Sequence, residues 1–262
     1  MISFRLFGVP ITVRPTFLII AALLGLSSRS VSLVAAWVGV VFVSILVHEM
    51  GHALTARSFG ATVEVELNAI GGLTSWSGAE ENFGPGRRAA VAAAGSGVGV
   101  VFGGLIWVIA LLTGPYTGVA GFVVTNLIFV NVFWGLLNWL PIRPLDGGHL
   151  LTSLLQKVAP KRAEQIANAV FLVTAAAALA AALWLRLYFI AFFAGWLLMG
   201  ELTQGRARTA PTPMPTMSFD PVPPQEPLPG EPSMPANDEN AGAEPDVDVS
   251  EAERRGTDSQ PS

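Results

Sequence analysis

The stretch SILVHEMGHALTARSFG, residues 44–60, places two histidines and a glutamate inside an otherwise apolar segment. The apolar pattern runs from 33 to 57, which exceeds the roughly 20 residues that a helix needs to cross a bilayer. On a helix, His48 and His52 are four residues apart and share one face, with Glu49 beside them. Ionisable residues at membrane depth are costly in free energy, so this segment predicts a membrane helix that carries a functional site.

The composition is that of a membrane protein rather than of a soluble domain. Of the 262 residues, 52% are hydrophobic and 13% are charged, and the mean hydropathy is +0.54. Soluble domains carry roughly 25% charged residues. The chain has no cysteine, which excludes disulfides and thiolate metal sites. Any metal must therefore be bound by histidine, aspartate or glutamate.

The apolar segments predict the fold class. We expect an all-α polytopic membrane protein with about six transmembrane helices, a small β-hairpin insert and a disordered C-terminal tail. The first and last segments are short, which suits a tilted or partly interfacial helix. The expected helices span residues 15–28, 33–57, 88–113, 117–140, 165–185 and 187–203.

The insert lies between the second and third expected helices, at residues 63–75. Val63, Val65 and Leu67 alternate with glutamates, and a Gly-Gly pair then predicts a turn. Open strand edges cannot face lipid, so we expect this hairpin at the membrane interface or paired within the protein. Its exposed edge would hold an unwound peptide by strand addition, and a role limited to covering the helices is an equal alternative.

The chain divides into two parts by composition. Residues 1–208 are expected to form the membrane-embedded domain, and residues 209–262 a disordered, proline-rich acidic tail. Eleven of the 19 acidic residues follow Arg208, against two of the 15 lysines and arginines. Such a segment buries too little apolar surface to offset the entropy lost on folding. We interpret the tail as a docking segment for a regulatory partner.

The basic residues indicate the orientation in the membrane. Most lysines and arginines of the membrane domain fall on one side of a six-helix arrangement, which leaves Arg29 and Arg186 on the other. Because cytoplasmic loops are enriched in these residues, both termini are predicted to be cytoplasmic. We expect a multi-pass protein of the plasma (inner) membrane. Residues 1–20 show no pattern of a removable signal peptide.

The HExxH spacing of His48, Glu49 and His52 suits a particular metal chemistry. The two imidazoles bind zinc, and the glutamate, which is not a ligand, accepts a proton from water and delivers it to a leaving amine. Zinc lowers the pKa of its water to about 7. Histidines that merely pack between helices are the alternative, but the position at membrane depth favours a metal site.

A catalytic zinc needs a third protein ligand and an open position for water. The apolar part of the chain offers Asp146, His149 and Glu201 as candidates. The first two lie in NWLPIRPLDGGHLL, residues 138–151, where two prolines end one helix and a new helical pattern begins. Asp146 is therefore also a candidate for the N-cap of that helix, a role that requires no metal.

Three features together resemble the site-2 protease family of intramembrane zinc metalloproteases. They are HEMGH in one membrane helix, a strand-rich insert, and NWLPIRPLDGGHLL after a later helix, and the resemblance covers about residues 5–203. It is to the compact six-helix branch, since no PDZ-sized insert and no paired CBS domain is present. The segment AAAGSGVGVVFGG, residues 92–104, stands where many relatives have a glycine-proline pair and an asparagine. Its small residues still suit close helix packing.

The resemblance assigns a role to each candidate residue. It implies that His48, His52 and Asp146 hold Zn²⁺ and that Glu49 activates water. It also implies that Asn138 binds the substrate backbone or the oxyanion, although a helix-end cap explains that asparagine equally well. His149 is then a structural neighbour of the site.

The resemblance also implies a function. It predicts an intramembrane zinc endopeptidase that hydrolyses a peptide bond in or near a transmembrane segment, in regulated intramembrane proteolysis. The expected partners are a transmembrane protein substrate and the lipid bilayer, with no nucleic acid. One alternative is a membrane zinc transporter, which needs no general base. Another is a non-catalytic relative that binds membrane segments, and the complete set of ligands and base argues against it.

Overall fold

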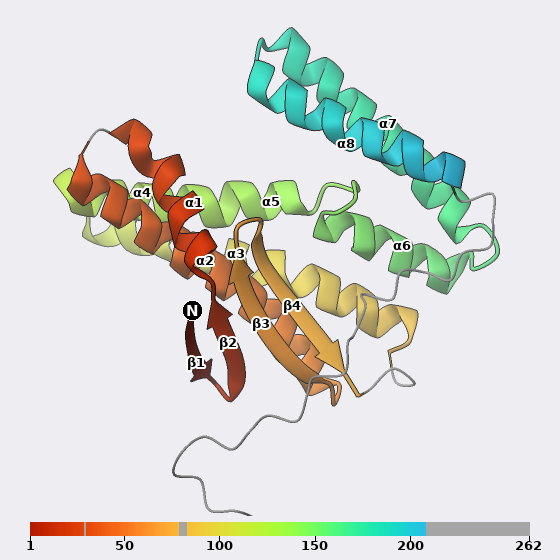
Figure 1. Cartoon of the computed structure of the whole chain (residues 1–262), viewed down its shortest axis with the longest axis horizontal. Coiled ribbons are helices and arrows are strands. Elements are labelled where there is room, and N and C mark those ends of the chain that lie inside the picture. The colour runs from red at the N-terminus through yellow and green to blue at the C-terminus, as the bar shows by residue number, and fades with distance from the viewer. Residues whose placement is uncertain (29, 79–82, 208–262) are drawn as a thin grey trace, which may run out of the picture. The chain divides into compact units, whose positions relative to one another are not determined.

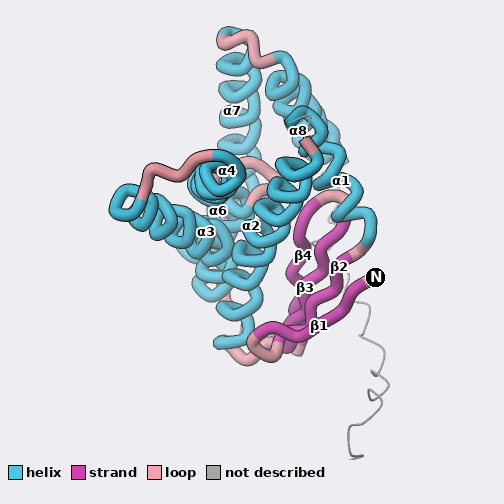
Figure 2. Tube along the Cα trace, turned by 90° about the vertical axis from the view of Figure 1, so that its left-hand side faces the viewer, coloured by secondary structure: helices cyan, strands magenta, loops and turns pink. Residues whose placement is uncertain are grey.

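The computed structural model describes residues 1–28, 30–78 and 83–207. It is mostly helical, with one small sheet beside the helices (Figures 1 and 2). The predicted acidic tail, residues 209–262, lies outside the described residues, and so do Glu80 and Glu81. The fold is therefore described for the membrane domain alone.

Four helical stretches are long and apolar enough to cross a membrane. They are α2 (Val31–Ser58), α3 (Pro85–Thr113), the stretch Gly118–Asn138 and α7 (Ala163–Trp184). Shorter apolar runs lie in α1 (Pro15–Gly25), which continues into the 3₁₀ turn η1 (Leu26–Ser28), and in α8 (Tyr188–Ala207). The chain is thus a multi-pass membrane protein, and the described residues bear out four of the six expected spans.

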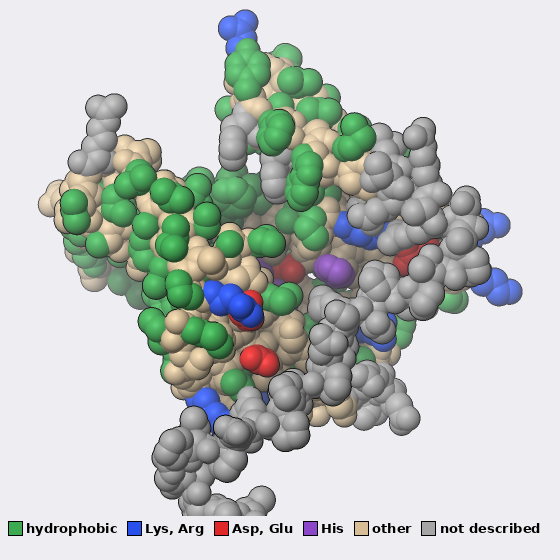
Figure 3. All heavy atoms as spheres, viewed as in Figure 1, with side chains coloured by type: hydrophobic (Ala, Val, Ile, Leu, Met, Phe, Trp, Pro, Cys, Tyr) green, Lys and Arg blue, Asp and Glu red, His purple; other side chains and the backbone are tan. Residues whose placement is uncertain are grey.

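The surface of these helices suits lipid rather than water. Leu111, Leu112 and Val173 are largely exposed, as are many other large apolar side chains of the helices. Figure 3 shows hydrophobic side chains over much of the described surface and few charged ones among them. A soluble monomer rarely exposes so continuous an apolar surface. The exposed apolar area is therefore expected to contact the bilayer.

The third spanning stretch is not a uniform α-helix. It consists of α4 (Gly118–Ile128), the π-helical turn η3 (Phe129–Trp134) and α5 (Gly135–Asn138). Asn131 is buried in the π turn and donates a hydrogen bond to the Ser44 hydroxyl of α2 at 2.8 Å. Because Ser44 lies one turn before His48, this bond fixes the third span against the part of α2 that carries the motif.

The sheet contains four strands in the order β1-β2-β3-β4. They are β1 (Ile2–Leu6), β2 (Val9–Val13), β3 (Thr62–Asn68) and β4 (Gly71–Ser77). Two antiparallel hairpins, β1–β2 and β3–β4, join through parallel pairing that places Ile11 opposite Val65. The predicted insert is thus a hairpin paired within the protein, and β4 forms one edge of the sheet. The prediction of an all-α protein with one hairpin missed the N-terminal pair of strands.

One face of the sheet packs on the C-terminal half of α2. Val63, Val65 and Leu67 are buried, as their alternation with glutamates predicts. They share a core with Ala53 and Ala56 of α2, which are both fully buried. Small residues on α2 let the sheet approach the helix closely, so the sheet lies beside the motif that precedes them.

Arg14 joins the start of α1 to β3. Its guanidinium donates two hydrogen bonds to the Glu66 carboxylate, at 2.7 and 2.8 Å. The hydrogen bond from Arg14 lowers the pKa of Glu66 below its ordinary value. Both side chains are partly exposed, so this pair orients the sheet more than it stabilises the fold.

The last described helices follow a loop that contains two prolines. Helix α6 (Asp146–Val158) begins after Pro144, and α7 and α8 then pack against each other. Arg143 ties the loop to α7, since its guanidinium lies 3.0 Å from a Glu164 carboxylate oxygen and 4.5 Å from the centre of the Phe171 ring. The loop thus holds the start of α6 in a defined position.

Candidate active site

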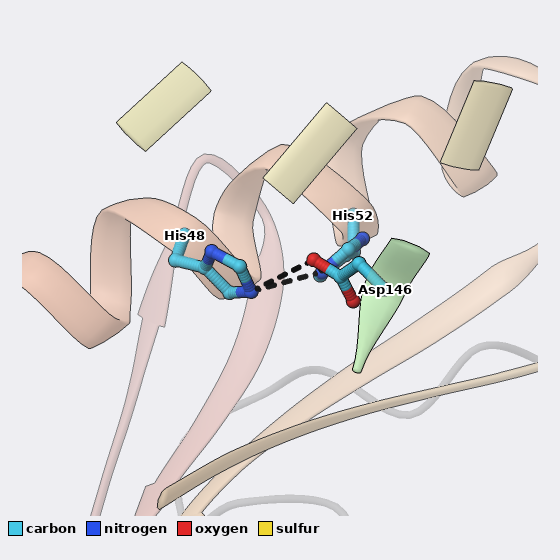
Figure 4. A group of neighbouring side chains, drawn as sticks. All are labelled: His48, His52 and Asp146. Atoms are coloured by element: carbon cyan, nitrogen blue, oxygen red, sulfur yellow. Dashed lines mark hydrogen bonds and ion pairs between the residues drawn. The ribbon is translucent and has the colours of Figure 1, made fainter. Parts of the chain in front are cut away.

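Two histidines of α2 and one aspartate of α6 converge (Figure 4). His48 Nε2 and His52 Nε2 are 3.2 Å apart. Each of these nitrogens lies 3.3 Å from Asp146 Oδ2. The three atoms therefore form a nearly equilateral triangle, and the structure brings together the three residues that the sequence predicts as ligands.

The triangle fits a tetrahedral metal ion. With metal–ligand distances of about 2.0–2.2 Å, neighbouring ligand atoms of a tetrahedral zinc site lie about 3.3–3.6 Å apart. Two nitrogen lone pairs and a carboxylate oxygen at such separations repel one another unless a metal ion or a ring proton lies among them. Two imidazoles and one carboxylate are also a common donor set of catalytic zinc, which leaves a fourth position for water or substrate.

The orientation of His52 is fixed by the backbone of α3. Its Nδ1 lies 2.7 Å from the carbonyl oxygen of Val91, and a carbonyl oxygen can only accept. The hydrogen of the neutral ring must therefore be on Nδ1, which leaves the lone pair of Nε2 directed at His48 and Asp146. Metal-binding histidines characteristically have such a partner on the second nitrogen.

Close approach of α3 makes this bond to His52 geometrically feasible. A β carbon on Gly51 would overlap the backbone of Ala94, and one on Gly95 would overlap the His52 imidazole. Gly95, Ser96, Gly99 and Gly103 are all buried. The small side chains in segment 92–104 therefore allow α2 and α3 to pack closely. They also leave room for the His52 imidazole between the two helices.

Asp146 is not the N-cap of α6, contrary to the alternative that the sequence leaves open. Leu145 occupies the N-cap position without a side-chain cap bond, and Asp146 is the first helical residue. Its carboxylate is directed at the histidines instead. Gly147 and Gly148 make this orientation of Asp146 possible, because they let the start of α6 approach the preceding loop closely. A β carbon on either glycine would overlap that loop, including the carbonyl oxygens of Trp139 and Ile142.

Two further side chains hold the Asp146 carboxylate. Asn138 Nδ2 donates to Asp146 Oδ2 at 2.8 Å and lies 3.4 Å from His48 Nε2. The Ser96 hydroxyl of α3 donates to the same oxygen at 2.9 Å, and Ser96 is fully buried. Asn138 is thus at the site, as expected, whereas the sequence offered Ser96 only as a packing residue.

Replacement of Ser96 by alanine is expected to weaken zinc binding by about 10- to 100-fold, because Asp146 would lose a partner that orients it. The measurement is zinc affinity of the purified protein, by competition with a chelator of known affinity. Ser77→Ala is a matched control, since it makes the same substitution at the last residue of β4, which is not one of the residues that converge at the site. Equal zinc affinity in Ser96→Ala and wild type would contradict the prediction.

Glu49 lies against the sheet rather than within the triangle. It is 6% exposed, and the Thr74 hydroxyl of β4 donates to its Oε2 at 2.6 Å. A β carbon on Gly72 would overlap the Glu49 carboxylate. The base that the sequence predicts is therefore held by two residues of the hairpin, and neither Thr74 nor Gly72 was assigned to the site from the sequence.

The other candidate ligands do not join the group. His149 is exposed, and the group of described residues with a geometry suited to a metal ion consists of His48, His52 and Asp146. The side chain of Glu201 lies outside the described residues. The geometry therefore favours Asp146 as the third ligand.

Comparisons with known proteins find similarity to zinc metalloproteases. Residues 115–181 match the model of peptidase family M50. A relative from Synechocystis sp., whose name assigns it provisionally to the zinc metalloproteases, is 34% identical over 58% of this chain and 43% of its own length. The zinc metalloprotease of Methanocaldococcus jannaschii is 27% identical over 59% of this chain and 45% of its own. The chain therefore spans less than half the length of these two relatives.

A solved structure shows the same fold. The site-2 protease from Methanocaldococcus jannaschii superposes with a TM-score of 0.54 and 22% sequence identity, over 77% of this chain and 94% of that one. The likeness thus extends well beyond residues 115–181 and includes most of the described helices and strands.

Proposed function

We propose that this chain is a member of the site-2 protease family and that it acts as an intramembrane zinc endopeptidase. Its substrate is a transmembrane segment of another membrane protein, cut within or near the bilayer. The observation that carries the proposal is the triangle of His48, His52 and Asp146, which matches tetrahedral ligand spacing, with a buried carboxylate on the adjacent residue of α2.

The residues of the site divide the chemistry among them. Zinc, when bound by His48, His52 and Asp146, supplies a Lewis acid that acidifies water and polarises a carbonyl group. Glu49 accepts the proton of the attacking water and delivers it to the leaving amine. Its burial excludes bulk water, so the proton stays within the site.

Asn138 is placed to assist this reaction. Its amide nitrogen has two hydrogens, and one is donated to Asp146 Oδ2 at 2.8 Å. The nitrogen also lies 3.4 Å from His48 Nε2, and zinc held by that imidazole would occupy its lone pair and leave the second hydrogen to donate to the substrate carbonyl oxygen as negative charge develops on it. A single such donor contributes about 10²- to 10³-fold to turnover in other enzymes.

The edge of β4 is the site at which the substrate binds in this proposal. A transmembrane helix hides its carbonyl groups in its own hydrogen bonds, so it must unwind before cleavage. The sheet order leaves β4 at one edge, and Thr74 of this strand contacts Glu49. Strand addition to β4 would therefore hold the unwound segment beside the base.

The arrangement in the membrane completes the proposal. We infer six spans, with α1 and α8 crossing the bilayer as short or tilted helices, and cytoplasmic termini in the plasma (inner) membrane. The acidic tail, residues 209–262, then lies in the cytoplasm, where it docks a regulatory partner. Cleavage serves regulated intramembrane proteolysis.

Removal of the metal is expected to abolish cleavage, and added Zn²⁺ to restore it. The protein is purified in detergent and placed in liposomes with a synthetic peptide, a lysine-flanked leucine-alanine helix with a central Asn-Gly pair. Elemental analysis is expected to give about one zinc per chain, as one tetrahedral site requires. Cleavage that persists after complete removal of zinc would overturn the proposal.

The same preparation separates the alternatives. Zinc flux into sealed liposomes without peptide cleavage would indicate a transporter. Binding of the peptide without cleavage, in zinc-loaded protein, would indicate a non-catalytic relative. The proposed protease instead retains its zinc through many turnovers.

A further inference from the structure

We propose that Thr74 is a positioning residue that orients the carboxylate of Glu49 for proton transfer. The hairpin β3–β4 would then do more than receive the substrate, because it would also complete the general base. This inference rests on the proposed function and adds to it a residue outside both sequence motifs.

The hydrogen bond of Thr74 is the first observation. Its hydroxyl lies 2.6 Å from Glu49 Oε2 and 3.2 Å from the Glu49 backbone oxygen. Thr74 is 5% exposed and Glu49 is 6% exposed, so water does not compete for this bond. A hydroxyl bond of this length to a carboxylate is charge-assisted and stronger than a neutral one. It occupies Oε2 and leaves Oε1 to accept the proton from water.

The second observation is the contact with Gly72. A β carbon at this position would overlap Glu49 at Oε1, Cγ and Cδ. Gly72 and Thr74 are two residues apart on β4, so they face the same side of the strand. Gly72 therefore limits where the Glu49 carboxylate can lie, and Thr74 forms a hydrogen bond to it.

The sheet makes this contact rigid. Thr74 pairs with Val65 and Gly72 pairs with Leu67, and both partners on β3 are fully buried. A residue held by paired strands is positioned more accurately than one on a loop. The Glu49 carboxylate therefore has one defined orientation, set by a separate element of the chain.

The test compares three variants in the full chain. Thr74→Val removes the hydroxyl with little change in shape, Thr74→Ser keeps the hydroxyl, and Gly72→Ala keeps Thr74 but displaces the carboxylate. Thr12→Val is the matched control, since Thr12 is a nearly buried threonine of the same sheet whose hydroxyl lies 3.4 Å from that of Ser3. Each is assayed for kcat and KM with the lysine-flanked peptide, for bound zinc and for thermal unfolding.

Thr74→Val is expected to lower kcat by roughly 10- to 100-fold, the effect of losing one hydrogen bond to a charged group. KM and zinc content are expected to stay within about threefold of wild type, because neither depends on how Glu49 is oriented. Thr74→Ser restores kcat to within about threefold, and Gly72→Ala loses at least as much kcat as Thr74→Val. Thr12→Val keeps wild-type kcat.

Two results would overturn the inference. One is wild-type kcat in Thr74→Val, and the other is a loss of kcat that Thr12→Val shares or that Thr74→Ser does not relieve. If Thr74→Val unfolds, Gly72→Ala decides alone, and wild-type kcat in that variant also counts against the inference. Failure of the proposed function is distinct, since it appears as undiminished cleavage in the zinc-free wild-type protein.

Discussion

Replacement of Glu49 by glutamine is expected to lower kcat by roughly 10²- to 10⁴-fold, the range that a general base contributes. Glutamine has the same shape, and its amide oxygen can still accept the hydrogen bond that the Thr74 hydroxyl donates to Oε2 at 2.6 Å. It cannot accept a proton from water at neutral pH. Because Glu49 is outside the ligand triangle, the variant should bind zinc as wild type does.

The measurement is peptide cleavage and bound zinc in the same preparation. Glu64→Gln is the matched control, since Glu64 lies on β3 and belongs to neither the cluster nor its hydrogen bonds. Full activity and full zinc are expected in that control. Unaltered turnover in Glu49→Gln, with zinc retained, would remove Glu49 from the mechanism as the general base.

The convergence of His48, His52 and Asp146 could be predicted in part, because ionisable residues are rare in apolar sequence. His48 and His52 share a helix face by spacing alone, and the chain offers few other ionisable residues at membrane depth. The spacing of the residues could not distinguish Asp146 from His149 as the candidate for the third ligand. That choice depends on the start of α6, where Gly147 and Gly148 pass close to backbone carbonyl groups of the preceding loop and so allow Asp146, the first residue of the helix, to point at the histidines.

The supporting hydrogen bonds could not be predicted from the sequence. Ser96 and Thr74 are 50 and 25 residues away from their partners, Asp146 and Glu49. Serine and threonine are common in helices and strands, and nothing in either neighbourhood distinguishes a bonding hydroxyl from a packing one. A buried hydroxyl in a lipid-embedded helix nevertheless needs a partner, and that requirement could have marked Ser96.

The N-terminal hairpin was missed because its turn lacks the usual residues. Ile2, Phe4 and Leu6 alternate with polar residues as a strand should. The turn is formed by Phe7 and Gly8, with φ of 50° and 77°. A two-residue turn with both φ positive usually contains Asn-Gly or Asp-Gly, so Phe-Gly gave no signal.

The third ligand provides the second large expected effect. Asp146→Ala is expected to weaken zinc binding by on the order of 10²- to 10⁴-fold. Zinc binding at structural sites is worth about 10–16 kcal/mol, so one of three protein ligands accounts for about 3–5 kcal/mol. Removal also leaves the two imidazoles facing each other at 3.2 Å without the carboxylate that balances the metal charge. Elemental analysis after gel filtration should find zinc in wild type and none in the variant.

His149→Ala is the matched control for Asp146→Ala, since His149 is exposed and lies only three residues further along α6. That variant should keep its zinc, because its side chain is not part of the converging group. Zinc retained in Asp146→Ala and lost in His149→Ala would move the third ligand to His149. Zinc retained in both would point to Glu201, and the triangle would then be a hydrogen-bonded cluster rather than a metal site. The spacing of 3.2–3.3 Å among the three donor atoms argues instead for loss of zinc in Asp146→Ala and its retention in His149→Ala, since this spacing is close to the edge of a zinc tetrahedron.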